Sequence, residues 1–159
     1  MKQFWLSLML AVICLTLFSS LALSQSVNGV ARPGQIVIRG KVVCLDESGR
    51  RLASEHNCQQ PSHRFGFDTS DGKFYLFLRS DSATAMFFDP RVCQRELQIT
   101  ARLDAEGQLE IIKVHSIHQG RLYDIYYFCE ICNITAYAPG PCHCCRQEFE
   151  LKETPVPEP

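Results

Sequence analysis

The stretch Arg95–Ile117, RELQITARLDAEGQLEIIKVHSI, sets the fold class of this 159-residue chain. Its first part alternates strictly between apolar and polar residues, and the apolar positions are Leu97, Ile99, Ala101 and Leu103. A period of two places such side chains on one face of a β-strand. Asp104–Gly107 begins and ends with turn-forming residues, and a second β-prone run follows it. The sequence therefore predicts two strands joined by a tight turn.

Shorter runs with the same β character lie on both sides of this pair. Upstream, two of them flank Asp71-Gly72, a dipeptide typical of hairpin turns, and downstream His118–Gly120 is a further turn signal. The additional predicted strands are Gln35–Leu45, Arg64–Phe67, Lys73–Leu78 and Leu122–Phe128. Their aromatic residues favour a core role over a ligand-stacking face. These residues are Phe65, Phe67, Phe74, Tyr75 and Phe77.

One segment departs from the β pattern. Ser80–Phe88 offers Ser80 or Asp81 as an N-cap and is followed by Asp89-Pro90 as a stop signal, which predicts a short helix. The predicted order is three strands, a short helix and two to three more strands. Over residues 35–117 this order resembles the OB-fold, a small, partly open five-stranded barrel. The resemblance implies a mainly β chain with an OB-like barrel, and another small barrel or a sandwich is the alternative.

A second informative segment contains two groups of cysteines separated by nine residues, Cys129-Glu130-Ile131-Cys132 and Cys142-His143-Cys144-Cys145. Two residues between cysteines let both sulfur atoms of a tight turn face one centre, and two such turns supply four thiolates for a tetrahedral site. The predicted metal ligands are Cys129, Cys132, Cys142 and Cys145, with Cys144 and His143 as substitutes.

This CxxC-x9-CxxC pattern resembles a zinc ribbon or a rubredoxin-type pair of knuckles. The resemblance implies a structural zinc ion, with iron as the other option, held by the segment 129–151. Neither cysteine pair is followed by the glycine that such knuckles often carry.

The N-terminus has the three parts of a secretory signal. Lys2 is followed by an apolar run, Phe4–Phe18, and then by the small residues Ala22 and Ser24. Residues 1–24 are therefore predicted to be a signal peptide, with an uncleaved membrane anchor as the alternative. Both interpretations place the rest of the chain outside the cytoplasm, in a periplasm or in the medium.

The remaining chain has the size of one domain, and no later segment is apolar enough to span a membrane. Its predicted parts are a polar linker (25–34), the OB-like β-domain (35–128), the cysteine knuckle (129–151) and a disordered Pro-rich tail (152–159).

Export makes disulfides the alternative to a metal. The chain has nine cysteines, of which Cys14 lies in the predicted signal. Cys44 and Cys58 are close in sequence and form a disulfide candidate. A second metal site from Cys44, Cys58, His63 and Cys93 has no motif to support it. Redox exchange or soft-metal handling by CxxC thiolates is a further alternative.

Charge and motifs narrow the function. The net charge is −1 and clusters of Lys and Arg are missing, so nucleic-acid binding is not expected. The sequence has no phosphate loop and no hydrolase motif, and we expect His115 and His118 to face solvent.

The chain as a whole resembles secreted bacterial proteins, and no family's activity carries over to it residue by residue. We predict an exported, non-enzymatic binding or accessory protein with a structural zinc site, whose partner is a protein or a small molecule. A thiol-based redox or soft-metal-handling protein is one alternative, and a disulfide-stapled extracellular binding domain without metal is the other.

Overall fold

The computed structural model describes residues 34–157 except 54–57, 59 and 61. The predicted signal peptide and nearly all of the predicted linker lie outside the described residues. The described chain is mainly β, as predicted. Among these residues, no helix is long and apolar enough to cross a membrane.

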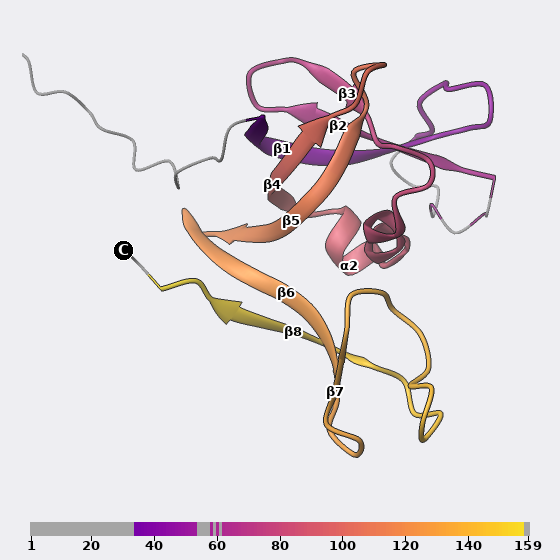
Figure 1. The fold of residues 1–159 in the computed structure, drawn as a ribbon, viewed down its shortest axis with the longest axis vertical. Coiled ribbons are helices and arrows are strands. Elements are labelled where there is room, and N and C mark those ends of the chain that lie inside the picture. Colours follow the sequence, from indigo (N-terminus) through magenta and orange to yellow (C-terminus); the bar gives the residue numbers. More distant parts are fainter. Residues whose placement is uncertain (1–33, 54–57, 59, 61, 158–159) are drawn as a thin grey trace, which may run out of the picture.

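Eight strands form one sheet of antiparallel neighbours (Figure 1). The strand order is β3-β2-β1-β4-β5-β6-β7, and β8 pairs with the other edge of β6. The strands are β1 (Gln35–Leu45), β2 (Arg64–Thr69), β3 (Phe74–Leu76), β4 (Glu96–Leu103), β5 (Leu109–His118), β6 (Arg121–Cys129), β7 (Ile134–Ala136) and β8 (Glu150–Pro155).

The first five strands close into a small barrel. Just after β3, Phe77 forms a parallel bridge with Leu109 at the start of β5, and the Leu78 N–H donates to the Leu109 carbonyl at 2.9 Å. This contact joins the two ends of the sheet segment β3-β2-β1-β4-β5. The predicted OB-like order of three strands, a helical segment and further strands is therefore confirmed.

Strand β1 exchanges partners at Gly40 and Lys41. The N-terminal part of β1 pairs with β4, the C-terminal part pairs with β2, and Gly40 has a partner in both strands, Leu97 and Thr69. A Cβ atom at Gly40 would lie 1.9 Å from the backbone oxygen of Asp68. Only glycine allows β2 to approach β1 this closely, because a side chain would collide with a backbone that cannot move away.

The helical segment between β3 and β4 consists of a 3₁₀ helix, η2 (Ser82–Phe88), and a single turn, α2 (Pro90–Cys93). Asp81 caps η2 by accepting from the Ala83 N–H, as predicted. The first helix ends at Phe88, directly before Asp89-Pro90, as predicted, and a separate helical turn then begins. Asp89 caps α2 by accepting from the Arg91 N–H, and Pro90 occupies the first helical position, where its missing N–H costs nothing.

The core lies between the barrel strands and this helical segment. Phe65, Phe67 and Phe77 are buried there with Phe87 of η2, and Phe65 and Phe77 have ring centroids 5.6 and 5.2 Å from that of Phe87. The predicted core role is thus confirmed for these three strand aromatics. The predicted core role is wrong for Phe74, which is 42% exposed. It pairs across the strands with Asp68 rather than with the buried Phe67, and therefore lies on the outer face of the barrel.

Strand β6 carries the chain out of the barrel. Its first half pairs with β5, its second half pairs with β7, and β8 covers Tyr123–Phe128 along the opposite edge. The sheet is therefore continuous across the predicted boundary between residues 128 and 129. The prediction of a disordered tail is wrong for residues 152–155, which belong to β8 and pair with β6 through their backbone.

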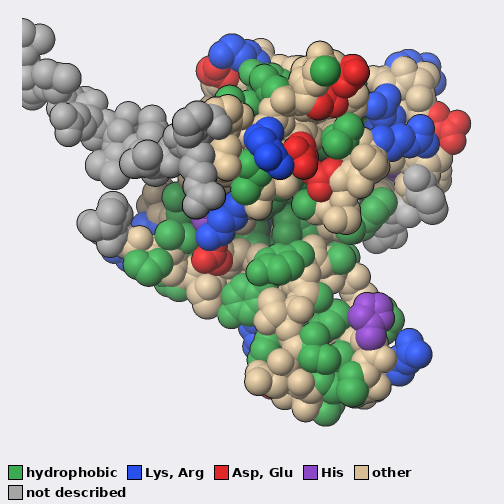
Figure 2. Space-filling model, viewed as in Figure 1, with side chains coloured by type: hydrophobic (Ala, Val, Ile, Leu, Met, Phe, Trp, Pro, Cys, Tyr) green, Lys and Arg blue, Asp and Glu red, His purple; other side chains and the backbone are tan. Residues whose placement is uncertain are grey.

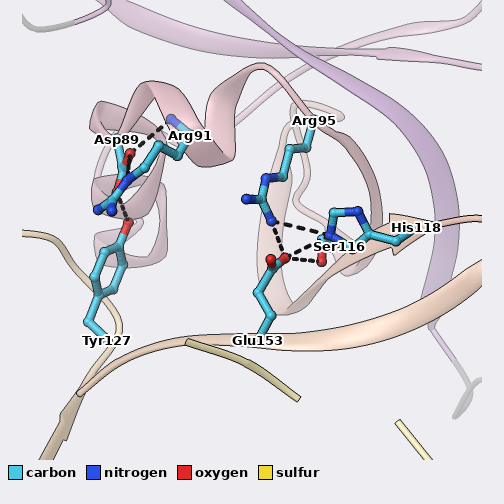
Figure 3. Close-up of polar contacts among 7 residues, drawn as sticks. All are labelled: Asp89, Arg91, Arg95, Ser116, His118, Tyr127 and Glu153. Atoms are coloured by element: carbon cyan, nitrogen blue, oxygen red, sulfur yellow. Dashed lines mark hydrogen bonds and ion pairs between the residues drawn. The ribbon is translucent and has the colours of Figure 1, made fainter. Parts of the chain in front are cut away.

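Two polar clusters attach these C-terminal strands to the barrel (Figure 3). In the first, the hydroxyl of the fully buried Tyr127 donates to Asp89 Oδ2 at 3.0 Å, and Arg91 forms an ion pair with the same carboxylate. The cap of α2 is thus also the anchor of β6.

The second cluster centres on Glu153 of β8. Its carboxylate accepts hydrogen bonds from the buried Ser116 hydroxyl at 2.5 Å and from Arg95, and it contacts His118 Nε2 at 3.0 Å. Burial alone would raise the pKa of Glu153, but the hydrogen bonds from Arg95, Ser116 and His118 outweigh it and lower the pKa to about 2. The folded state therefore favours the ionised carboxylate.

We expect Glu153→Gln to lower the free energy of unfolding by about 1.5–3 kcal/mol, the usual range for hydrogen bonds to a charged group. The contribution of the carboxylate is complete above its unfolded pKa of 4.5 and disappears as the pH falls through about 2. Urea unfolding of both proteins at pH 7, 4 and 2.5 would measure this convergence.

Glu150→Gln on the same strand is the matched control, because Glu150 is exposed and pairs only with Lys152 among the described contacts. A change within about 0.5 kcal/mol is expected for it. Equal losses in the two variants would contradict the anchoring role of Glu153.

Candidate metal centre

Two hairpins bring the clustered cysteines together. Cys129 is the last residue of β6, and Cys132 lies in the turn that leads to β7. The second hairpin is closed by a bridge between Pro141 and Glu148 and contains Cys142 and Cys145. Inside it, the Cys142 N–H donates to the Gln147 carbonyl at 2.7 Å. Residues 150 and 151, which the prediction assigned to the knuckle, belong to β8, so from here on the knuckle is residues 129–149.

The four predicted ligands converge on one point. The sulfur atoms of Cys129, Cys132, Cys142 and Cys145 all lie within 4.8 Å of one another, and the Cys129 and Cys145 sulfur atoms are 3.4 Å apart. Four thiolates around one zinc ion at about 2.3 Å would be about 3.8 Å from each other. The predicted knuckle is therefore confirmed as a cluster whose size fits a single metal ion.

Backbone groups of the second hairpin favour a thiolate. The N–H groups of Cys145 and Cys144 point at the Cys142 sulfur and lower the pKa of Cys142 to about 7. At Cys132, by contrast, a hydrogen bond with the Cys144 thiol and burial raise the pKa. Cys142 therefore ionises readily and Cys132 does not. A bound cation would stabilise the thiolate form of all four cysteines.

The predicted substitute ligands lie at the edge of this cluster. Cys144 and His143 are exposed, and neither belongs to the group of four atoms. Cys144 contacts the cluster through Cys132. The geometry thus favours Cys129, Cys132, Cys142 and Cys145 as the four ligands over the two substitutes.

The residue after each cysteine pair has a backbone conformation that usually requires glycine. Asn133 has φ 54° and Arg146 has φ 66°, both in the left-handed region. The turn geometry of a knuckle is therefore present although its usual glycines are missing. Asparagine tolerates this region well, and arginine does so at a cost.

The cysteines of the β-domain form a second group. Cys44 and Cys58 have their Cα atoms 5.8 Å apart and their sulfur atoms in bonding contact, and the Cys93 sulfur lies 3.9 Å from that of Cys58. This placement is what the predicted Cys44–Cys58 disulfide requires. His63 does not belong to the group, so the residues of the conceivable second metal site come together only in part.

The expectation that His115 faces solvent is wrong. His115 is 8% exposed, and burial, together with Lys113, lowers its pKa. Its Nε2 atom lies 3.1 Å from Asp124 Oδ1 across the β5–β6 pairing. Residue alternation alone could not reveal this, because it does not show which strand covers a polar position.

The cluster of Ser116, His118 and Glu153 contains the residue types of a hydrolase triad but not its arrangement. The Ser116 hydroxyl is fully buried and donates to Glu153 rather than to His118. A nucleophile must contact both its base and a substrate, so this cluster is structural.

No protein-family model, no curated protein and no solved structure matches the chain. This result agrees with the expectation that no family's activity carries over to it. The function has to be argued from the residues of the site itself.

We expect Arg146→Gly to raise the free energy of unfolding by about 0.5–1 kcal/mol, because glycine removes the strain of a positive φ. Gln147→Gly is the matched control, since Gln147 is also exposed and has no positive φ; there glycine should destabilise by a similar amount. Thermal unfolding would measure the change in stability of each variant. A loss of stability in Arg146→Gly would contradict the claim that the backbone at Arg146 is strained.

Proposed function

We propose that this chain is an exported, non-enzymatic binding or accessory protein whose knuckle is held together by one zinc ion bound to Cys129, Cys132, Cys142 and Cys145. The observation that carries the proposal is the convergence of these four sulfur atoms within 4.8 Å. A set of four protein thiolates leaves no open coordination position, which is typical of structural rather than catalytic zinc. Zinc in such a site supplies folding energy and no redox chemistry.

Burial supports a structural role for the ion. From residue 130 to residue 149, Cys142 is the one buried residue, so the knuckle has no hydrophobic core of its own. Phe149, with Leu151 of β8, packs against the barrel core from outside. A segment this poor in apolar contacts needs a cross-link or a metal to hold a unique conformation.

The binding role draws support from the surface between the barrel and the knuckle. A groove of about 1330 Å³ lies there, lined by β5, β6 and the loop before Cys142. Its walls include Ile112 and Tyr137, which are 41% and 66% exposed. Figure 2 shows hydrophobic side chains at the waist where the two parts meet and on the visible face of the knuckle. Export rests on the N-terminal segment, outside the described residues.

A thiol-based redox or soft-metal-handling function is the second candidate, and the exposed Cys144 beside Cys132 favours it. The thiol with the lowered pKa is Cys142, however, and Cys142 is fully buried. A reactive cysteine must combine a thiolate with access to its substrate. In this knuckle the two properties belong to different residues, which favours structural metal. The disulfide-stapled alternative predicts two separate pairs of sulfur atoms. It does not require all four sulfur atoms to lie around one point, as they do here.

We expect the purified mature protein to contain about one zinc ion per chain, and a chelator to release the four thiols of the cluster. Cys142→Ser should lose the metal and make the knuckle sensitive to protease while the barrel still unfolds cooperatively. Elemental mass spectrometry, a thiol count and limited proteolysis measure these outcomes.

Cys144→Ser is the matched control, because Cys144 is a neighbouring cysteine outside the group of four. It should keep the metal and the protease resistance. A wild-type protein with neither metal nor free thiols in the knuckle would establish the disulfide alternative, and unchanged metal content in Cys142→Ser would rule out the proposed ligand set.

A further inference from the structure

A second group of sulfur atoms lies apart in sequence from the knuckle. Cys44 belongs to β1, Cys58 to the loop between β1 and β2, and Cys93 ends α2. Their three sulfur atoms lie within 4.8 Å of one another. Since a disulfide uses two cysteines, a bridge between Cys44 and Cys58 leaves the Cys93 thiol in contact with it, 3.9 Å from the Cys58 sulfur.

We propose that Cys44, Cys58 and Cys93 form a thiol–disulfide exchange centre, in which Cys58 is bonded alternately to Cys44 and to Cys93. The proposal rests on the predicted Cys44–Cys58 disulfide and is independent of the zinc knuckle. Cys58 is the shared partner because it is the cysteine of the loop, whereas the other two belong to regular secondary structure.

The reaction needs no oxidant or reductant. Cys93 loses its proton to solvent, and its thiolate attacks the Cys58 sulfur. A bond forms between the Cys93 and Cys58 sulfur atoms while the bond between Cys58 and Cys44 breaks. Cys44 leaves as a thiolate and takes up a proton. One disulfide and one thiol are present before and after, as in any exchange of this kind.

The surroundings admit solvent to the three sulfur atoms. All three cysteines line a cavity of about 640 Å³. Its wall is apolar at Phe88 and Pro90 and carries charges at Lys41, Asp68 and Glu96. Burial raises the pKa of Cys93 to about 11, so the thiol is protonated at neutral pH. The exchange is therefore slow near neutral pH and accelerates as the thiolate becomes more populated.

Exchange would change how the β1–β2 loop is attached. With Cys58 bonded to Cys44, the loop is anchored to β1; with Cys58 bonded to Cys93, it is anchored to α2. Leu52 and Ala53 of the same loop also line the cavity, so the exchange takes place at the cavity wall.

Disulfide mapping tests the proposal. The mature protein is incubated at pH 6 and at pH 9, quenched with acid, alkylated and digested, and the peptides with Cys44, Cys58 and Cys93 are identified by mass spectrometry. We expect to find both the Cys44–Cys58 and the Cys58–Cys93 linkages at each pH. The rate at which the two linkages interconvert should rise about tenfold per pH unit, because the population of the thiolate does so. Cys93→Ser, the control, should contain the Cys44–Cys58 linkage alone.

Cys44→Ser gives a second, independent readout. It should form the Cys58–Cys93 linkage completely, provided that circular dichroism shows a folded protein. If this variant does not fold, the wild-type mapping still decides. A wild-type protein that holds the Cys44–Cys58 linkage alone at both pH values would overturn the exchange. Three free thiols, or thiols that react only after chelation, would overturn the disulfide on which it rests, and both results leave the metal content of the knuckle unaffected.

Discussion

The pairing of β6 with three other strands is the constraint on which the rest of the molecule depends. The first half of this strand extends the barrel sheet through β5, and the second half begins the knuckle through β7. β8 runs along the opposite edge and returns the chain toward the barrel. Because backbone hydrogen bonds along one strand set the register of all three partners, the position of the cysteine cluster relative to the barrel follows from β6.

Two side-chain contacts add to the backbone pairing that holds β6 and β8 against the barrel. Tyr127 is fully buried and reaches the carboxylate that caps α2, so the helical turn and the strand hold each other. Glu153 ties β8 to the start of the barrel's fourth strand through Arg95. Both contacts bridge elements far apart in sequence. The one between Tyr127 and Asp89 is buried, where a polar group requires a partner.

Local sequence pattern predicted the barrel well for a physical reason. Strand β4 buries every second residue from Leu97 to Ala101, so its residues alternate, and the turns that follow Thr69 and Leu103 carry Asp and Gly. Strand β5 departs from this pattern, because Val114, His115 and Ser116 are all buried. The cysteine cluster was equally predictable, because two CxxC turns need only local geometry to aim their sulfur atoms at one centre. The helical segment was found from its cap, Asp81.

The errors concern features that depend on distant partners. β8 has no fully buried residue, so its sequence lacks alternation, and it exists as a strand because β6 offers an edge and Arg95 offers an ion pair. The buried position of His115 follows from pairing with Asp124, which no local pattern contains. The left-handed backbone at Arg146 could not be predicted either, because arginine rarely adopts that conformation and does so here only because the knuckle turn requires it.

The cover that β8 gives to β6 also bears on solubility. Tyr123–Phe128, YDIYYF, is a short, aromatic stretch with one charge, the composition of segments that stack into cross-β assemblies when their edge is open. β8 occupies that edge along its whole length. Its own outer edge carries Lys152 and ends in Pro155, two residues that discourage a further strand from pairing. β8 therefore covers the edge of β6 at which a second copy of the chain could otherwise pair.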